Sequence, residues 1–168
     1  QLWDDLDNYS SAEDNMDTVR NDYLEERELG MTHGPIYTAE ELKQFLHSEE
    51  FYIIPIGSKD EGLNTDGTPK RRSVQDGRAA GHTGHTHSHT NSNGEFPGVQ
   101  DKRHAMAVCK QDNIRIITIK FDISKAHRRT AVPPADYKYL VVILHDKNNR
   151  REYWVNLVHT YGIASAQH

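Results

Sequence analysis

The chain has 168 residues, of which 35% are hydrophobic and 27% are charged, which limits it to about one ordinary domain with a modest core. It contains no apolar run of about 18 residues, which excludes a membrane-spanning helix, and its one cysteine excludes an internal disulfide. Residues 1–30 carry ten acidic residues and two arginines, a net charge of −8. Since the whole chain has a net charge of −5, residues 31–168 carry +3. This asymmetry is compatible with nucleic-acid binding by the basic part, and equally with a solvated first helix.

Apolar spacing and capping signals predict three helices. The first covers residues 11–29 and ends before a glycine. The second covers residues 38–48, where Thr38 and Glu41 form a capping box. The third follows a Pro-Gly pair and covers residues 99–110.

Runs of β-branched and aromatic residues predict strands between these helices and after them. Residues 58–69 carry turn residues, and residues 77–98 are expected to form a loop. The last two strands are joined by a short turn and are therefore expected to pair in antiparallel fashion. We expect an α/β (α+β) fold, an antiparallel sheet with flanking helices. The predicted strands are residues 51–57, 71–75, 114–121, 137–145 and 153–159.

Asp122 follows the isoleucine-rich run 114–121 and precedes a predicted helical turn. A carboxylate at this edge of a sheet, beside the backbone carbonyl of Ile123, suits nucleotidyl transfer, in which carboxylates hold two Mg²⁺ ions about 3.5–4 Å apart. His127, five residues on, would return over the same pocket. An acid in this position more often caps the next helix, and that interpretation stays open.

Two other segments have a possible role beside a nucleic acid. Lys70, Arg71 and Arg72 open a predicted strand, and arginine binds phosphate oxygens in a bidentate manner. A charged edge strand that discourages aggregation has the same pattern. Gly162 opens a segment of small side chains that would let a nucleic-acid backbone approach closely, although an ordinary strand-to-helix turn also has this composition.

Four histidines lie in the loop rich in glycine, serine and threonine. Their spacing would allow several imidazoles to surround one Zn²⁺ or Ni²⁺ ion. Incidental weak affinity is the interpretation we favour over a functional zinc site. These histidines are His82, His85, His87 and His89.

The order and spacing of these segments resemble the reverse-transcriptase domain of retroelements. Residues 51–59, the turn and residues 70–77 are similar to the fingers hairpin, a strand ending in lysine, a turn and the pattern K-x-R-x-V-x-D. Asp122 with Ala126 resembles the first palm motif, D-x-x-x-A. Residues 160–166 resemble the next palm motif, P-F-G-L-x-S-A-P. The resemblance covers residues 25–168 and implies a partial polymerase fingers–palm fold.

The resemblance also implies a chemistry, the Mg²⁺-dependent extension of a DNA strand on an RNA template. Asp122 would hold both catalytic Mg²⁺ ions, and the carbonyl of Ile123 would contact one of them. His127 would stand where the family has an aromatic residue that excludes ribonucleotides.

In the same family, Arg72 with Lys59 or Lys70 would contact the incoming triphosphate, and Gly162 would lie along the nucleotide and the template. The implied partners are an RNA template, a DNA primer and deoxynucleotides.

The sequence departs from the family at His127, which replaces tyrosine or phenylalanine, and at Thr160, which replaces proline. The paired aspartates that follow the second palm motif are not in the sequence. We therefore expect no polymerase activity from this chain alone, and self-association through a truncated palm.

The expected regions are an acidic helical segment (residues 1–30), a fingers-like region with the histidine-rich loop (residues 31–112) and a partial palm (residues 113–168). The rival interpretation is a non-catalytic module that binds nucleic acid or metal, or an inactive retroelement remnant.

Overall fold

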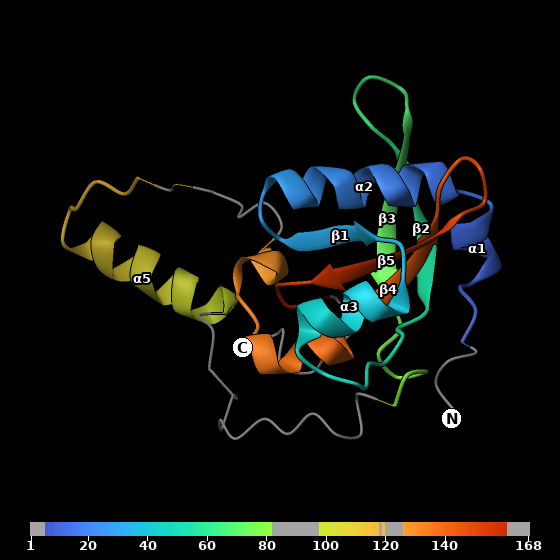
Figure 1. Cartoon of the computed structure of the whole chain (residues 1–168). Helices are drawn as coiled ribbons and strands as arrows, with labels where there is room; N and C mark the ends of the chain where they lie inside the picture. Colours follow the sequence, from blue (N-terminus) through green and yellow to red (C-terminus); the bar gives the residue numbers. More distant parts are fainter. Residues whose placement is uncertain (1–5, 82–97, 118, 120–125, 161–168) are drawn as a thin grey trace. The chain divides into compact units, whose positions relative to one another are not determined.

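The computed structural model describes residues 6–81, 98–117, 119 and 126–160. The chain forms two compact units, residues 1–87 with residues 125–168, and residues 88–124. The fold is mixed α/β with antiparallel sheets, as the sequence predicts (Figure 1). Its helices are α1 (Ser10–Glu13), α2 (Met16–Glu28), α3 (Ala39–Leu46), α5 (Val99–Gln111) and the 3-10 helices η1 (Ala126–Arg129) and η2 (Pro134–Tyr139); its strands are β1 (Thr32–Ile36), β2 (Ile56–Leu63), β3 (Pro69–Gln75), β4 (Val141–His145) and β5 (Arg151–Asn156).

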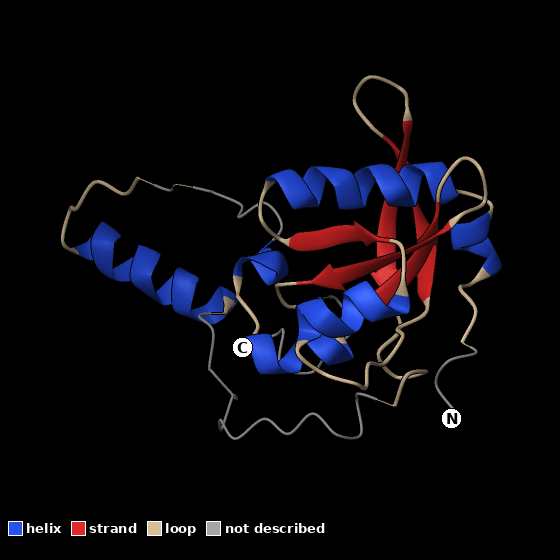
Figure 2. Ribbon diagram, in the orientation of Figure 1, coloured by secondary structure: helices blue, strands red, loops and turns tan. Residues whose placement is uncertain are grey.

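The first unit is organised around a three-stranded antiparallel sheet with the order β1-β5-β4. Helix α2 lies along one side of these strands and α3 along the other, as Figure 2 shows. The sheet therefore joins β1, from the expected fingers-like region, with two strands that follow residue 113. Thr38 caps α3, because its hydroxyl accepts a hydrogen bond from the backbone N–H of Glu41 at 3.2 Å.

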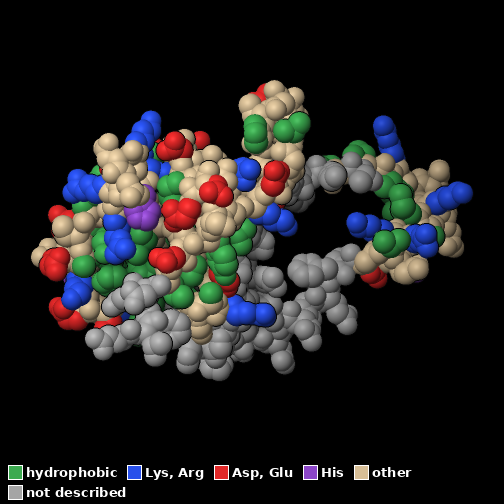
Figure 3. Space-filling model, turned by 90° about the vertical axis from the view of Figure 1, so that its right-hand side faces the viewer, with side chains coloured by type: hydrophobic (Ala, Val, Ile, Leu, Met, Phe, Trp, Pro, Cys, Tyr) green, Lys and Arg blue, Asp and Glu red, His purple; other side chains and the backbone are tan. Residues whose placement is uncertain are grey.

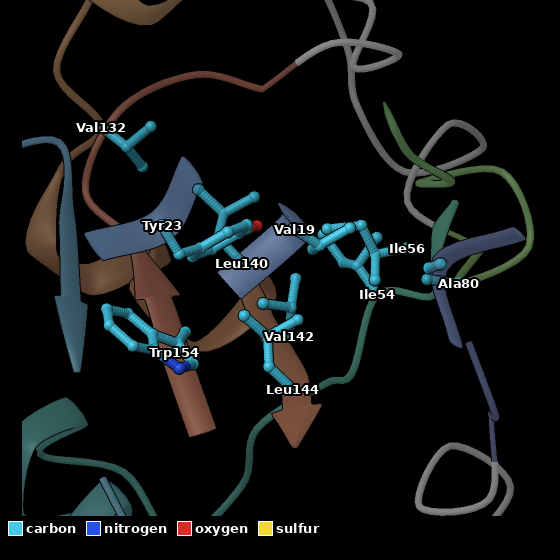
Figure 4. Packing of buried hydrophobic residues seen from close by; sticks show 11 residues of the cluster. Val19, Tyr23, Ile54, Ile56, Ala80, Val132, Leu140, Val142, Leu144 and Trp154 are labelled. Atoms are coloured by element: carbon cyan, nitrogen blue, oxygen red, sulfur yellow. The ribbon is translucent and has the colours of Figure 1, made fainter. Parts of the chain in front are cut away.

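Strand β4 is buried on both of its faces, so it contributes to two hydrophobic clusters. Val142 and Leu144 pack with Val19 and Tyr23 of α2 and with Trp154 of β5 (Figure 4). Since side chains alternate along a strand, the intervening Val141 and Ile143 face the α3 side, where they pack with Leu42 and Leu46.

The absence of a side chain at Gly34 allows β1 to approach Trp154 of β5 closely. Its φ is +146°, and a Cβ atom placed there would lie 2.8 Å from the indole ring of Trp154. A side chain at this position would collide with the core, and L residues rarely adopt this backbone conformation.

Strands β2 and β3 form a separate antiparallel hairpin. Its register places Gly57 opposite Val74, Ser58 opposite Ser73, and Lys59 opposite Arg72. The register shifts between Asp60 and Leu63, and the loop end of the hairpin projects beyond α2 (Figure 1).

The second unit contains α5, which has no buried residue in the described part of the chain. Asp101 accepts a hydrogen bond from the backbone N–H of Gly98 at 2.7 Å and so caps this helix. The strand predicted at residues 114–121 is wrong over residues 114–117 and 119, which form no strand.

Other sequence predictions are confirmed or corrected. The helices expected at residues 38–48 and 99–110 correspond to α3 and α5, whereas the one expected at residues 11–29 is divided into α1 and α2 by a turn at Asp14 and Asn15. The turn expected at residues 58–69 is wrong in its first half, because β2 extends to Leu63. The strand expected at residues 137–145 begins later, since η2 extends to Tyr139. None of the described helices is long and apolar enough to cross a membrane.

Candidate nucleic-acid interface

The β2–β3 hairpin has one face turned toward α2, which we call the inner hairpin face. There Ser73 donates a hydrogen bond to Asp22 at 2.9 Å, Gln75 donates one to the hydroxyl of Tyr23, and Ile56 is fully buried. Because side chains alternate along each strand, Gly57, Lys59, Arg72 and Val74 must lie on the opposite side, which we call the outer hairpin face.

Lys59 and Arg72 are directly opposite each other on the outer hairpin face. Cβ atoms of such a pair are typically about 4.5–5.5 Å apart, and two like charges at this separation repel each other. Glu61 offsets part of the repulsion, since its carboxylate lies 3.0 Å from the guanidinium of Arg72 and 3.6 Å from the ammonium of Lys70. The structure thus brings together Lys59, Lys70 and Arg72.

These three cations make the outer hairpin face a candidate anion-binding surface. All three side chains are exposed, and together with the carboxylate of Glu61 these four groups carry a net charge of three minus one, or +2. Arg71 is on the inner hairpin face, where it pairs with Asp60 at 3.9 Å. Figure 3 shows side chains of both signs on the visible side of the molecule, so the arrangement on the hairpin is a local feature.

Sequence reasoning missed a buried polar network behind the hairpin. Asn156 is fully buried, and its side-chain oxygen accepts hydrogen bonds from Arg128 at 2.9 Å and from Gln75 at 3.2 Å. Arg128 also pairs with Glu26 of α2, and Gln75 with Tyr23. The network therefore joins the base of the hairpin to η1, the 3-10 helix that follows Asp122 in the sequence.

Burial raises the pKa of Tyr23 to about 12, because its phenol lies in the core, where a phenolate would lose its hydration. The positive charge of Arg128 opposes this shift and lowers the pKa in part. Tyr23 is therefore a neutral hydroxyl group over the ordinary pH range. It serves the network as a hydrogen-bond acceptor for Gln75.

A hollow of about 480 Å³ lies on the α3 side of the sheet. Lys43 and Arg151 contribute positive charge to its lining, and Glu49 and Glu50 contribute negative charge. Lys43 is paired with Glu49 at 3.3 Å. With these charges balanced, the hollow does not favour an anionic ligand as the outer hairpin face does.

Several residues singled out in the sequence lie outside the described part of the chain. The η1 backbone includes His127, but its side chain is not among the described ones. Among the residues that the structure describes, no group of three histidine, cysteine, aspartate or glutamate side chains is arranged to hold a metal ion. The residues outside the description are Asp122, Ile123, Gly162, His82, His85, His87 and His89.

Comparison with known proteins identifies no relative that has these residues. The sequence matches no protein-family model and no curated protein.

Proposed function

We propose that this chain is the fingers and first part of the palm of a retroelement reverse transcriptase, and that it contacts nucleic acid and the incoming nucleotide through the outer hairpin face. The observation that carries the proposal is the placement of Lys59 opposite Arg72, with Lys70 on the same exposed face. These are the positions that the resemblance assigns to triphosphate contacts.

The hairpin suits this task for two physical reasons. Two antiparallel strands fix the spacing of the cations, so phosphate oxygens meet positive groups whose separation is already set. The guanidinium of Arg72 is also held by Glu61 at 3.0 Å, which limits its rotamers before a ligand arrives. An arginine held in this way loses less conformational freedom when it binds phosphate.

The catalytic part of the proposal rests on the sequence motif around Asp122. In a complete polymerase, Mg²⁺ held by this carboxylate would stabilise the charge that develops as the primer hydroxyl attacks the α-phosphate. Asp122 itself lies outside the described residues, but Arg128, in the 3-10 helix that follows it in the sequence, belongs to the buried network at the base of the hairpin.

The test uses a fluorescein-labelled RNA–DNA primer–template duplex and fluorescence anisotropy at several KCl concentrations. Arg72→Ala removes a cation from the outer hairpin face, and Arg71→Ala removes its neighbour from the inner hairpin face. We expect Arg72→Ala to weaken binding about threefold to tenfold and to reduce the magnitude of the salt slope by about one. Arg71→Ala should leave both quantities close to the wild-type values.

Equal effects of the two variants would show that only overall charge matters, and the assignment of Arg72 would be wrong. Absence of any salt-dependent binding by the wild-type chain would contradict the proposed function itself. A non-catalytic binding module would retain the binding pattern but would show no preference for a primer–template with a recessed 3′ end over a blunt duplex.

A further inference from the structure

Residues 8–11, which lead into the first turn of α1, lie along the edge of β2 opposite to β3. The backbone N–H of Tyr9 donates a hydrogen bond to the carbonyl of Ile56 at 3.0 Å. The side chain of Asn8 accepts one from the backbone N–H of Ile56 at 3.1 Å, and Ser11 accepts one from the backbone N–H of Ser58 at 3.1 Å. These bonds fix residues 8–11 to the hairpin.

From this edge, the side chain of Tyr9 crosses the base of the hairpin. A Cβ atom placed on Gly57 would lie 3.6 Å from the ring of Tyr9, in ordinary van der Waals contact. At its far end, the phenol donates a hydrogen bond to the carboxylate of Asp76, just after β3. This bond raises the pKa of Tyr9 and lowers that of Asp76.

The ring of Tyr9 is on the outer hairpin face. It lies on the side of β2 toward which a side chain at Gly57 would point, and Lys59, two residues further along the strand, points to that same side. Two residues of strand span about 6.6–6.8 Å, so the ring and the Lys59–Arg72 pair are neighbours. Tyr9 remains 47% exposed, which leaves much of its surface available to a ligand.

We propose that Tyr9 is a stacking platform for an unpaired base of single-stranded RNA whose phosphates are bound by Lys59 and Arg72. Proteins that bind single strands combine a cationic track with aromatic rings on which bases stack, and the outer hairpin face has both parts side by side. This inference rests on the proposed function and names a contact that the sequence motifs do not contain. The bond to Asp76 holds the ring in place, and Gly57 leaves room for it.

The experiment measures the affinity of the full chain for a labelled, unstructured single-stranded RNA by fluorescence anisotropy. Tyr9→Leu removes the ring but retains an apolar side chain, whereas Tyr9→Phe keeps the ring and loses only the bond to Asp76. We expect Tyr9→Leu to raise Kd at least about fivefold and Tyr9→Phe to raise it no more than about twofold. Because stacking is not electrostatic, neither variant should change the salt slope. Tyr139→Leu is the matched control, since Tyr139 is a 37% exposed tyrosine outside the hairpin.

A second pair of variants perturbs the ring without changing Tyr9. Gly57→Val places methyl groups in the space that the ring occupies and should weaken binding as Tyr9→Leu does. Gly57→Ala adds only the Cβ atom, which fits at ordinary contact distance, and should bind like the wild type. If circular dichroism shows that Tyr9→Leu perturbs folding, the two Gly57 variants still test whether the position of the ring determines RNA affinity.

Equal weakening by Tyr9→Leu and Tyr9→Phe would overturn the inference, because the hydroxyl tether rather than the ring would then matter. Unchanged binding by Tyr9→Leu would also overturn it, even if Arg72→Ala still weakens binding and the proposed function stands. Loss of salt-dependent binding by the wild-type chain would overturn both proposals together.

Discussion

The two faces of the β2–β3 hairpin are built from alternate residues of the same strands, yet their polar side chains meet opposite conditions. On the inner hairpin face, Gln75 is 7% exposed and donates hydrogen bonds to buried partners. On the outer hairpin face, Lys59 and Arg72 are exposed and carry like charges opposite each other. The hydroxyl of Ser73 and the amide nitrogen of Gln75 find their partners within the fold, whereas the like charges of Lys59 and Arg72 face solvent, and Glu61 offsets part of their repulsion. This difference separates buried residues that maintain the fold from exposed charged residues that a ligand can reach.

The largest effect is expected from a substitution of Arg128, which belongs to the buried network behind the inner hairpin face. Its side chain is only 4% exposed. Arg128→Ala would leave Glu26 without its buried cation, and the loss of one partner of a buried ion pair costs about 3–5 kcal/mol. Urea unfolding monitored by circular dichroism measures this loss. Lys147→Ala, at an exposed position in the turn between β4 and β5, should change the free energy of unfolding by no more than about 0.5 kcal/mol. Comparable losses in the two variants would contradict the structural role of the network.

Alkaline pH should also weaken the interactions behind the inner hairpin face, because it ionises Tyr23. The pKa of Tyr23 is raised from 10.0 to about 12 in the folded state, so its contribution to stability is fully present below pH 10 and is lost as the pH rises through 12. The shift corresponds to about 2–3 kcal/mol. Tyr23→Phe should therefore flatten the decline of the unfolding free energy between pH 10 and 12. A decline of the same steepness in both proteins would show that Tyr23 ionises as easily in the folded state as in the unfolded chain.

The smallest expected effect concerns the charge balance of the outer hairpin face. Glu61→Gln removes the carboxylate that partly neutralises Lys70 and Arg72. Because the gain in positive charge outweighs the lost restraint on the Arg72 side chain, it should tighten RNA binding about twofold to fivefold. Asp60→Asn is the matched control, because it removes an acid that pairs with Arg71 on the inner hairpin face. The unfolding free energy should change by about 0.5 kcal/mol or less for Glu61→Gln. Equal tightening by both variants would reveal a general charge effect.

Local signals in the sequence were sufficient to predict the helices and strand β3, which is rich in basic residues. Thr38 and Glu41 indicated where α3 begins, and the structure has the predicted hydrogen bond. β1 was not predicted, because Gly34 and Pro35 disfavour a strand locally, and the strand depends on pairing with β5. The polar run after Gly57 has the composition of a turn, but pairing with β3 extends it into a strand.

The buried network could not be predicted for a different reason. Glu26 and Arg128 are separated by 102 positions, and Tyr23 and Asn156 by 133. Glu26, Arg128 and Asn156 look like ordinary surface residues in their local sequence, and only the packing of α2 against the sheet makes them buried. Tyr9 escaped sequence reasoning in the same way, since its place beside Lys59 depends on the contact between residues 8–11 and β2.

The most direct test of the account is an NMR titration of the arginine side chains with single-stranded RNA. The Nε–Hε resonances of Arg71 and Arg72 report on adjacent residues that point to opposite faces of one strand. The account predicts that the Arg72 resonance shifts in a saturable manner as RNA is added, while the resonances of Arg71 and of the buried Arg128 stay in place. A saturable shift of Arg71 with an unchanged Arg72 would contradict the assignment of nucleic-acid binding to the outer hairpin face.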